Sequence, residues 1–333
     1  MSSLSISLRE RLSIAVFAGV VATLLWVLDS GVALNFIMMT LYAALLAQAW
    51  NVLGGFGGQF SFGHALFFGT GAYVQAMAQV HWGLNPWLAL PLGMVISTAV
   101  GLFVGALSFR YGLKGSYFAL VTLAFAEVFR IVATSVPFTG AGVGLMVPLR
   151  EGVDNMQFAS RRGYGLLVLS LVVLALCLTH WLRHSRFGAW LQAVRDNEDA
   201  ARAVGVNPFG IKLGAIALSA ALMGSAGAFY VQVFQYIDPG IAYGPHTSVE
   251  ALVGAIVGGM GTLWGPVAGA LVLHVLADLT RNLFGQLPGI NMVIYGMVLV
   301  LMVMFAPRGI TGTGQSIRRW WLRSDRDHKK EQA

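Results

Sequence analysis

The chain has 333 residues, of which 57% are apolar and 11% are charged, and its mean hydropathy is +0.72. A soluble domain carries about 25% charged residues and does not bury so much apolar surface, so the composition excludes a secreted enzyme, a disordered chain and a disulfide scaffold. Cys177 is the single cysteine, which excludes an internal disulfide. The composition therefore predicts a protein that crosses a membrane several times.

Ten apolar runs are predicted to span the membrane, which takes a helix of about 20 residues, although the eighth run is short for a full crossing. In chain order they are 12–28, 32–53, 62–80, 86–109, 115–135, 163–182, 211–236, 248–260, 263–280 and 290–306. Arg9 and Arg11 precede the first run, but no convincing cleavage site follows it, so we expect a retained helix rather than a signal peptide. The predicted fold is an all-α polytopic membrane protein with about ten transmembrane helices.

The basic residues predict the orientation of these helices. If both termini are cytoplasmic, all but five of the 21 Lys and Arg residues fall on the cytoplasmic side, as the positive-inside rule requires. The exceptions are Arg130, Arg150, Arg161, Arg162 and Arg281. The net charge of +7 then reflects topology rather than nucleic-acid binding. We divide the chain into a transmembrane domain, 1–310, and a basic cytoplasmic tail, 311–333, which suits anionic membrane lipid.

Two apolar runs end in the pattern GG-x-G, at 54–58 and at 258–261. Glycine-interrupted segments in matching positions mark the substrate pathway of many transporters, although glycines also simply allow helices to pack closely. The first segment continues into polar residues at membrane depth, which need partners or water. The predicted pathway residues are Gly57, Gly58, Gln59, Ser61, His64, Gly258, Gly259 and Gly261. The alternative for His64 is a packing histidine.

Charged residues inside the predicted spans are few. Glu127 and Arg130 lie at i, i+3 in the run 115–135, a spacing that predicts an intramembrane ion pair. No helix carries a dense row of acidic residues of the kind found in ion-coupled carriers. We find no His, Cys, Asp or Glu cluster with metal-ligand spacing, so no metal site is predicted. Lys114 and Lys212 lie beside glycines but do not fit a P-loop, so we expect neither ATP binding nor enzyme activity in this chain.

The segment 183–210 is a long charged loop on the expected cytoplasmic side. Its composition predicts a helix from Ala189 to Val204, stopped by Gly205 and followed by Pro208. Such a helix either lies on the membrane surface or docks into a groove on a soluble partner.

Within this loop, Asp199-Ala200-Ala201 followed by Gly205 resembles the EAA-x-x-x-G motif of ABC-transporter permeases, with Asp in place of Glu. Five blocks in order, covering roughly residues 40 to 310, are similar to branched-chain amino acid permeases of the LivM type. They are NVLGGFGGQFSFGHALFFGTGAY, KGSYFALVTLAFAEVFR, AVRDNEDAARAVGVNPFGIKL, VGGMGTLWGPVAGA and FAPRGITG.

The resemblance implies a permease subunit of an ATP-driven importer for branched-chain amino acids in a bacterial inner membrane. It implies a LivH-like partner permease, two cytoplasmic ATPase subunits that bind the ATP, and a periplasmic binding protein that meets the outer segments 136–162 and 237–247. This chain would need no cofactor of its own. The implied ATPase-coupling residues are Arg195, Glu198, Asp199, Ala200, Ala201, Arg202 and Gly205.

Three alternatives stay open from the residues themselves. The same kind of importer could carry urea, small amides or aromatic acids. A stand-alone ion-coupled carrier would need no ATPase. A structural subunit would use the segment 183–210 only to hold a partner.

Overall fold

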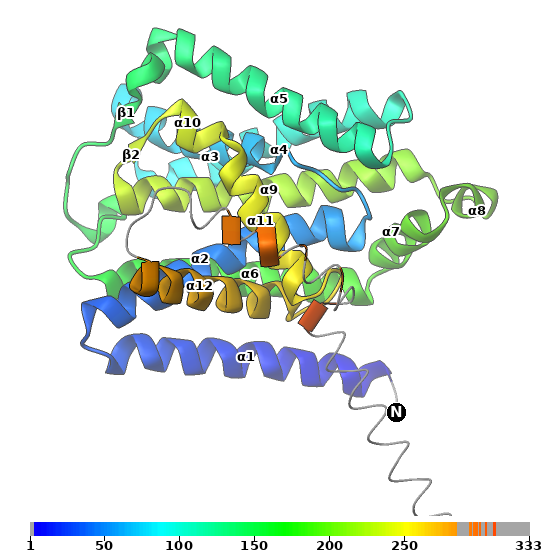
Figure 1. Cartoon of the computed structure of the whole chain (residues 1–333), viewed down its shortest axis with the longest axis horizontal. Helices are drawn as coiled ribbons and strands as arrows, with labels where there is room; N and C mark the ends of the chain where they lie inside the picture. Colours follow the sequence, from blue (N-terminus) through cyan, green and yellow to red (C-terminus); the bar gives the residue numbers. More distant parts are fainter. Residues whose placement is uncertain are drawn as a thin grey trace, which may run out of the picture.

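The computed structural model describes residues 3–284 together with 293–294, 296–298, 300, 304 and 309–310. Long helices run back and forth through this part of the chain and form a bundle (Figure 1). They are α1 (Ser3–Val27), α2 (Gly31–Trp50), α3 (His64–Trp82), α4 (Pro86–Arg110), α5 (Gly115–Ser135), α6 (Arg161–His184), α9 (Pro208–Phe234), α11 (Pro245–Gly258) and α12 (Gly265–Phe284).

Four of these helices begin at a side chain that caps them. Ser30, Asn85, Ser160 and Asn207 each accept a hydrogen bond from a backbone N–H in the first turn of α2, α4, α6 and α9. Ser and Asn are preferred at this position because the first N–H groups of a helix have no partner within it. Polar residues between apolar runs therefore set where the helices start.

Six helices in the described part are long and apolar enough to cross a membrane. They are Ser7–Val27, Gly31–Phe56, Pro86–Arg110, Gly115–Ser135, Arg161–His184 and Pro208–Phe234, and Gly265–Thr280 is a shorter apolar helix. The chain is thus an all-α, multi-pass membrane protein. Helices α3 and α11 occupy the predicted runs 62–80 and 248–260 without meeting the same measure. The predicted tenth span, 290–306, falls largely outside the described residues, and the count of ten stays a prediction.

The core of the bundle is built around α3 and α9, and α3 is buried over almost its whole length. Glycines let the two helices touch. A Cβ on Gly71 would lie 2.1 Å from the Gly224 carbonyl oxygen, and one on Gly227 would lie 2.0 Å from the Phe68 carbonyl oxygen. Small residues serve this purpose in membrane helix pairs, where close backbone approach replaces the hydrophobic effect.

Short elements gather at one end of the bundle, which we call the β end (Figure 1). They are β1 (Leu145–Met146), β2 (Tyr236–Ile237), α10 (Pro239–Tyr243), and the single turns η2 (Pro137–Thr139), η3 (Ala141–Val143) and η4 (Val153–Asn155). Strands β1 and β2 pair antiparallel, and the N–H of Val147 donates to the Gln235 carbonyl at 2.8 Å. The two segments predicted to lie outside therefore join each other.

The opposite end holds α7 (Arg186–Asp196) and α8 (Glu198–Ala203), and we call it the α8 end (Figure 1). The first residues of α1 and the last residues of α2 and α11 lie at this end. Helix α2 does not stop cleanly there but widens into a π-helical turn, η1 (Asn51–Phe56). Such wide turns are rare and occur often at functional sites.

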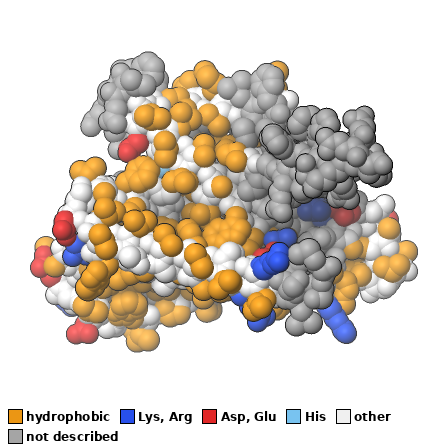
Figure 2. All heavy atoms as spheres, turned by 90° about the horizontal axis from the view of Figure 1, so that it is seen from below, with side chains coloured by type: hydrophobic (Ala, Val, Ile, Leu, Met, Phe, Trp, Pro, Cys, Tyr) orange, Lys and Arg blue, Asp and Glu red, His pale blue; other side chains and the backbone are white. Residues whose placement is uncertain are grey.

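The face of the molecule over α1 is mostly apolar. Figure 2 shows hydrophobic side chains spread over its middle and charged side chains toward its two ends. The exposed residues of α1 include Leu12, Val16, Val20 and Leu24. This distribution suits a surface in contact with lipid, since hydrocarbon offers polar groups no partner.

Candidate coupling site

The segment 183–210 folds into two helices, α7 and α8, so the prediction of one helix from 189 to 204 is wrong. Asn197 separates them with an extended backbone, φ −157° and ψ 107°. Its side-chain oxygen accepts hydrogen bonds from the N–H groups of Asp199 and Ala200 at 3.1 and 2.9 Å. Asn competes in this way with the continuing helix, so it ends α7 and caps α8.

Helix α7 packs onto the first glycine segment. A Cβ on Gly58 would lie 2.3 Å from Cγ of Arg195, and Gly58 has φ +64°, a conformation that favours glycine. The Arg195 guanidinium passes this point and donates from Nη1 to the Gly55 carbonyl at 3.1 Å. A Cβ on the neighbouring Gly57 would lie 3.4 Å from Leu191 of α7. Glycine here makes room for the helix that carries the charged loop.

The two glycine segments, far apart in sequence, lie against each other. A Cβ on Gly55 would lie 2.6 Å from the backbone nitrogen of Gly261. Asn51 of η1 joins them, since its Oδ1 accepts from the Gly261 N–H at 2.8 Å and its Nδ2 donates to the Thr262 carbonyl at 3.1 Å. Arg195, Gly55 and Gly261 therefore meet at one joint, defined here as residues 51–58, 259–263 and α7.

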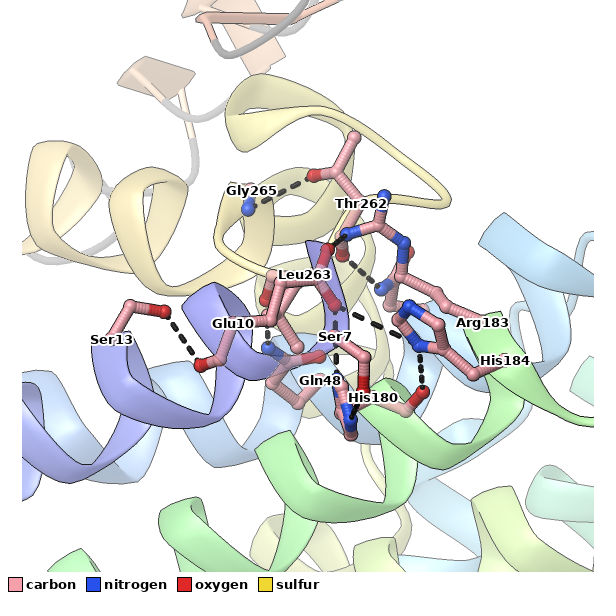
Figure 3. Close-up of polar contacts among 11 residues, drawn as sticks. Ser7, Glu10, Ser13, Gln48, His180, Arg183, His184, Thr262, Leu263 and Gly265 are labelled. Atoms are coloured by element: carbon pink, nitrogen blue, oxygen red, sulfur yellow. Dashed lines mark hydrogen bonds and ion pairs between the residues drawn. The ribbon is translucent and has the colours of Figure 1, made fainter. Parts of the chain in front are cut away.

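Gln48 holds the same loop one turn earlier in α2. Its Nε2 donates to the Leu263 carbonyl at 2.8 Å (Figure 3), and its Oε1 accepts from Thr179 of α6 at 3.3 Å. Sequence reasoning missed both Gln48 and Asn51. The signal was present, because a buried amide inside an apolar run needs a partner in a membrane protein.

The polar residues after the first glycine segment fix that loop within the chain. Ser61 Oγ accepts from the Gly63 N–H at 3.2 Å. His64 is fully buried and its Nε2 lies 2.9 Å from Ser219 Oγ, which donates to a carbonyl of α2. Gln59 donates to the Gly57 carbonyl at 3.2 Å, while its Oε1 has no hydrogen-bond partner among the described residues. Their role in a pathway stays a prediction.

Gly258 and Gly259 end α11 beside the start of α12. A Cβ on Gly258 would lie 1.7 Å from the Gly265 carbonyl oxygen. Gly309, near the end of the described residues, approaches the same place, and its Cβ would lie 2.5 Å from the Gly259 backbone. In the described chain these glycines thus permit close backbone contact.

Glu198 ties α8 to two membrane helices. Its Oε2 accepts from Lys212 of α9 at 2.7 Å and lies 3.0 Å from Lys114, the residue before α5. Burial by itself raises the pKa of Glu198, but the hydrogen bonds and charges of the two lysines outweigh it and hold that pKa below 4.5. Lys212 is only 4% exposed and also lies over the ring of Phe109. Ion pairs of Glu198 with Lys114 and Lys212 therefore connect the loop to α5 and α9.

The seven predicted coupling residues divide into two sets. Arg195, Glu198 and Ala201 contact or face the membrane helices. Asp199, Ala200, Arg202 and Gly205 lie exposed, and the Asp199 side chain is 85% exposed. The first set holds the loop in place, and the second is open to another protein.

Gly205 ends α8 in a left-handed conformation, φ +87°, and its N–H donates to the Arg202 carbonyl at 3.0 Å. A groove of about 350 Å³ follows, lined by Trp190, Val204, Gly205, Val206, Asn207, Gly210 and Ile211. Val204 is 79% exposed at its edge. An open apolar groove beside exposed charges is a suitable surface for a partner side chain.

Glu127 and Arg130 lie elsewhere, on the outer side of α5. Arg130 donates from Nε and Nη2 to the two carboxylate oxygens of Glu127 at 2.9 and 2.5 Å. The arrangement is bidentate, which is the strongest form of this contact.

A polar cluster joins α1 to α6 at the α8 end (Figure 3). Glu10 Oε2 lies 2.9 Å from His180 Nδ1 and 3.8 Å from His184 Nδ1. These three residues are close enough to hold a metal ion, so the prediction that the chain has no His, Cys, Asp or Glu cluster with metal-ligand spacing is wrong. Arg183 donates to Glu10 at 2.6 Å, and Arg11 lies 3.4 Å from His180. Two cations therefore already contact Glu10 and His180, through Glu10 Oε1 and His180 Nε2, which disfavours a metal ion. The absence of a metal stays a prediction.

A family of membrane transport subunits matches most of this chain. The model described as branched-chain amino acid transport system / permease component matches residues 32–303. The chain therefore belongs to this family of permease components.

Relatives from several organisms agree with that assignment. The chain is 30% identical to the high-affinity branched-chain amino acid transport system permease protein LivM of Salmonella typhimurium, covering 82% of this chain and 68% of that protein. It is 26% identical to the probable branched-chain amino acid transport permease protein LivH of Methanocaldococcus jannaschii, covering 73% and 80%. It is also 25% identical to the fructose import permease protein FruF of Bifidobacterium longum, covering 71% and 67%.

Proposed function

We propose that this chain is the LivM-like permease subunit of an ATP-driven importer for branched-chain amino acids, with both termini in the cytoplasm of a bacterium. The observation that carries the proposal is the position of α7 and α8. Arg195 binds the joint between the two glycine segments, while Asp199 and Arg202 on α8 lie exposed. A loop placed in this way can pass the movement of a soluble partner to the membrane helices.

The partners follow from the family. The similarity to both LivM and LivH relatives supports a pore made of this chain and a LivH-like permease related by approximate two-fold symmetry. Two ATPase subunits would bind the exposed side of α8 and supply the ATP site. A periplasmic binding protein would dock at the β end, where the segments 136–162 and 237–247 join.

The mechanism is alternating access. Closure of the ATPase pair moves α8, and Glu198 passes this movement to Lys114 before α5 and to Lys212 in α9. Arg195 moves with α7 and displaces the joint at which α2 and α11 end. Glycine-broken helices can shift there with little change in the rest of the bundle.

The test of the function is uptake by the assembled complex. This chain, its partner permease and the ATPases are reconstituted in proteoliposomes with the binding protein outside. We expect ATP-dependent uptake of labelled leucine, isoleucine and valine, and far less of urea, aromatic acids or fructose. Uptake by this chain alone, driven by an ion gradient, would support a carrier instead. A complex that never takes up solute would support a structural subunit.

Docking of α8 makes a narrower prediction. Reversing the exposed charge in Asp199→Lys should leave the fold intact, because the side chain is 85% exposed, but should uncouple ATP hydrolysis from uptake. The matched control is Asp29→Lys in the turn between α1 and α2, whose side chain is 94% exposed and lies outside both segments proposed to dock a partner. Equal uptake by the two variants would remove Asp199 from the ATPase contact.

A further inference from the structure

Helix α5 exposes most of its surface along its whole length. Its buried residues form one stripe, Phe118, Ala119, Thr122, Ala126 and Ala133. Large apolar side chains elsewhere are open, and Leu120 is 62% and Ile131 54% exposed. Figure 1 shows α5 at the edge of the bundle. A helix in this position meets either lipid or a second membrane protein.

The Glu127–Arg130 pair lies on this exposed side. The two side chains are 49% and 38% exposed. At 1.5 Å per residue, Glu127 lies about 12 Å from the end of α5 at Ser135, within the depth of the hydrocarbon core. Ionised residues at that depth are costly in lipid and face a protein interior or a water-filled cavity. The pair does not point into its own bundle, so a cavity that held its charges in water would have to lie between this chain and a neighbouring membrane protein.

The two ends of α5 reach the two regions that a pathway must connect. At the β end the chain runs from α5 directly into η2 and η3, beside β1 and β2. At the α8 end Lys114, the residue before α5, pairs with Glu198 of α8 at 3.0 Å. A movement of α8 is therefore passed directly to the helix that carries the ion pair.

We propose that Glu127 and Arg130 form a binding station for the two charges of the transported α-amino acid, and this inference rests on the proposed function. The ammonium group of the amino acid binds Glu127, and its carboxylate binds Arg130. The pathway then runs along the exposed side of α5, between this chain and its partner permease, rather than through the bundle.

The pair has enough free hydrogen-bonding capacity for both charges. A guanidinium has five N–H donors, and the contact with Glu127 uses one on Nε and one on Nη2. Three donors stay available for a carboxylate. The Glu127 carboxylate keeps lone pairs for an ammonium group. An amino acid therefore binds without breaking the pair.

The surroundings of the pair suit an aliphatic side chain. Leu123 and Ile131 lie one turn on either side of Glu127 on the same helix face. Both are exposed, at 37% and 54%. A branched aliphatic side chain finds apolar contact there, whereas a sugar has no charged group with which to bind Glu127 or Arg130.

The experiment measures thiol labelling in the assembled complex with Cys177 replaced by Ser. Ile131→Cys and Val20→Cys are compared, because both native side chains are 54% exposed in this chain and only α5 should face water. We expect a charged maleimide to react about tenfold faster or more at position 131. L-leucine should slow this reaction, and 4-methylpentanoate and 3-methylbutylamine, which each lack one charge, should slow it much less.

Charge variants in the Ile131→Cys background identify the ligands. Glu127→Gln and Arg130→Gln should each raise the leucine concentration needed for protection about tenfold or more. The swap Glu127→Arg/Arg130→Glu restores an ion pair but reverses the order of the charges, so protection should stay weak. Wild-type protection in the swap would show that the pair is structural. Equal labelling at 131 and 20 would place the α5 side in lipid.

The experiments can refute the binding station and the proposed importer function separately. ATP-driven leucine uptake by the parent complex establishes the importer whatever happens at position 131. If that uptake is present but leucine never protects Ile131→Cys, the binding station is wrong and the function stands. If leucine uptake is absent from the parent complex, the function itself is wrong.

Discussion

Two carboxylates pair with an arginine one turn further along their own helix, Glu198 in α8 and Glu127 in α5, and their surroundings differ. Glu198 is 17% exposed and contacts Arg202 of α8, Lys212 of α9 and Lys114, the residue before α5. Glu127 is 49% exposed, and its recorded partner in the described chain is Arg130 on the same helix. One carboxylate joins parts of the protein, and the other joins none.

The difference distinguishes a carboxylate that holds several elements together from one that lies on an open surface. Glu198 pairs with the buried Lys212 and with cations on other parts of the chain, so its loss should destabilise the fold. An ion pair that connects nothing within its own chain stabilises little, so its place inside a membrane needs another reason. We expect substitutions at the α8 end to lower stability and coupling to ATP hydrolysis, and substitutions on α5 to lower the affinity for the transported amino acid.

The largest effect should come from Glu198→Gln. The substitution leaves the Lys212 ammonium, 4% exposed, without its carboxylate, and breaking a buried pair from one side costs about 3 kcal/mol. The midpoint of thermal unfolding in detergent measures this loss. Glu127→Gln is the comparison, and its shift should be much smaller because that pair is half exposed.

A second substitution checks the cause. In Glu198→Gln/Lys212→Met no buried charge is left, so more than half of the lost stability should return. Asp199→Asn, a substitution at the exposed residue next to Glu198, should shift the unfolding midpoint little. A double variant as unstable as the single one would show that the ion pair is not what Glu198 contributes.

The apolar runs predicted where most of the long helices lie. From α2 to α12 the predicted runs and the long helices coincide within four residues, because apolar length and polar caps are local properties, whereas α1 begins nine residues before its predicted run. The stop at Gly205 was also predictable, since a glycine after a helical run serves as a C-terminal cap. In the same way the i, i+3 spacing led directly to the contact between Glu127 and Arg130.

Contacts between distant segments could not be predicted from local sequence patterns. Asn51 binds the backbone of Gly261, and Glu10 binds His180, but no local pattern relates their positions in the sequence. The break at Asn197 is a different kind of miss. Its neighbours favour a helix, and the side chain overrides them by capping the next one. Sequence shows which polar groups need partners, and only packing shows which partners they find.

A smaller effect is expected where α7 packs on the first glycine segment. Gly58→Ala places a Cβ 2.3 Å from Arg195 at φ +64°, so the arginine has to shift away from the Gly55 carbonyl. Gly83→Ala is the matched control, because φ is +58° there and nothing lies within 4 Å of the new Cβ. The left-handed conformation costs about 1 kcal/mol at either site, and the contact adds about 1 kcal/mol at Gly58.

Uptake separates these two glycines further. Only Gly58→Ala should lower ATP-driven uptake, since only that substitution displaces Arg195. Equal unfolding midpoints and equal uptake in the two variants would mean that the joint tolerates movement of α7 and that Arg195 does not transmit it.

The smallest effect concerns pH and again distinguishes the two carboxylates. The pKa of Glu198 in the folded chain lies below its ordinary 4.5, because Lys212 and Lys114 outweigh the effect of burial. A lowered folded pKa means that the contribution of Glu198 is complete above pH 4.5 and is lost as the pH falls through the folded value. The difference in unfolding midpoint between wild type and Glu198→Gln should therefore be constant from about pH 7 to about pH 5 and shrink in stronger acid. A difference that persists or grows in acid would mean that the ionised carboxylate is not what holds α8 to α5 and α9.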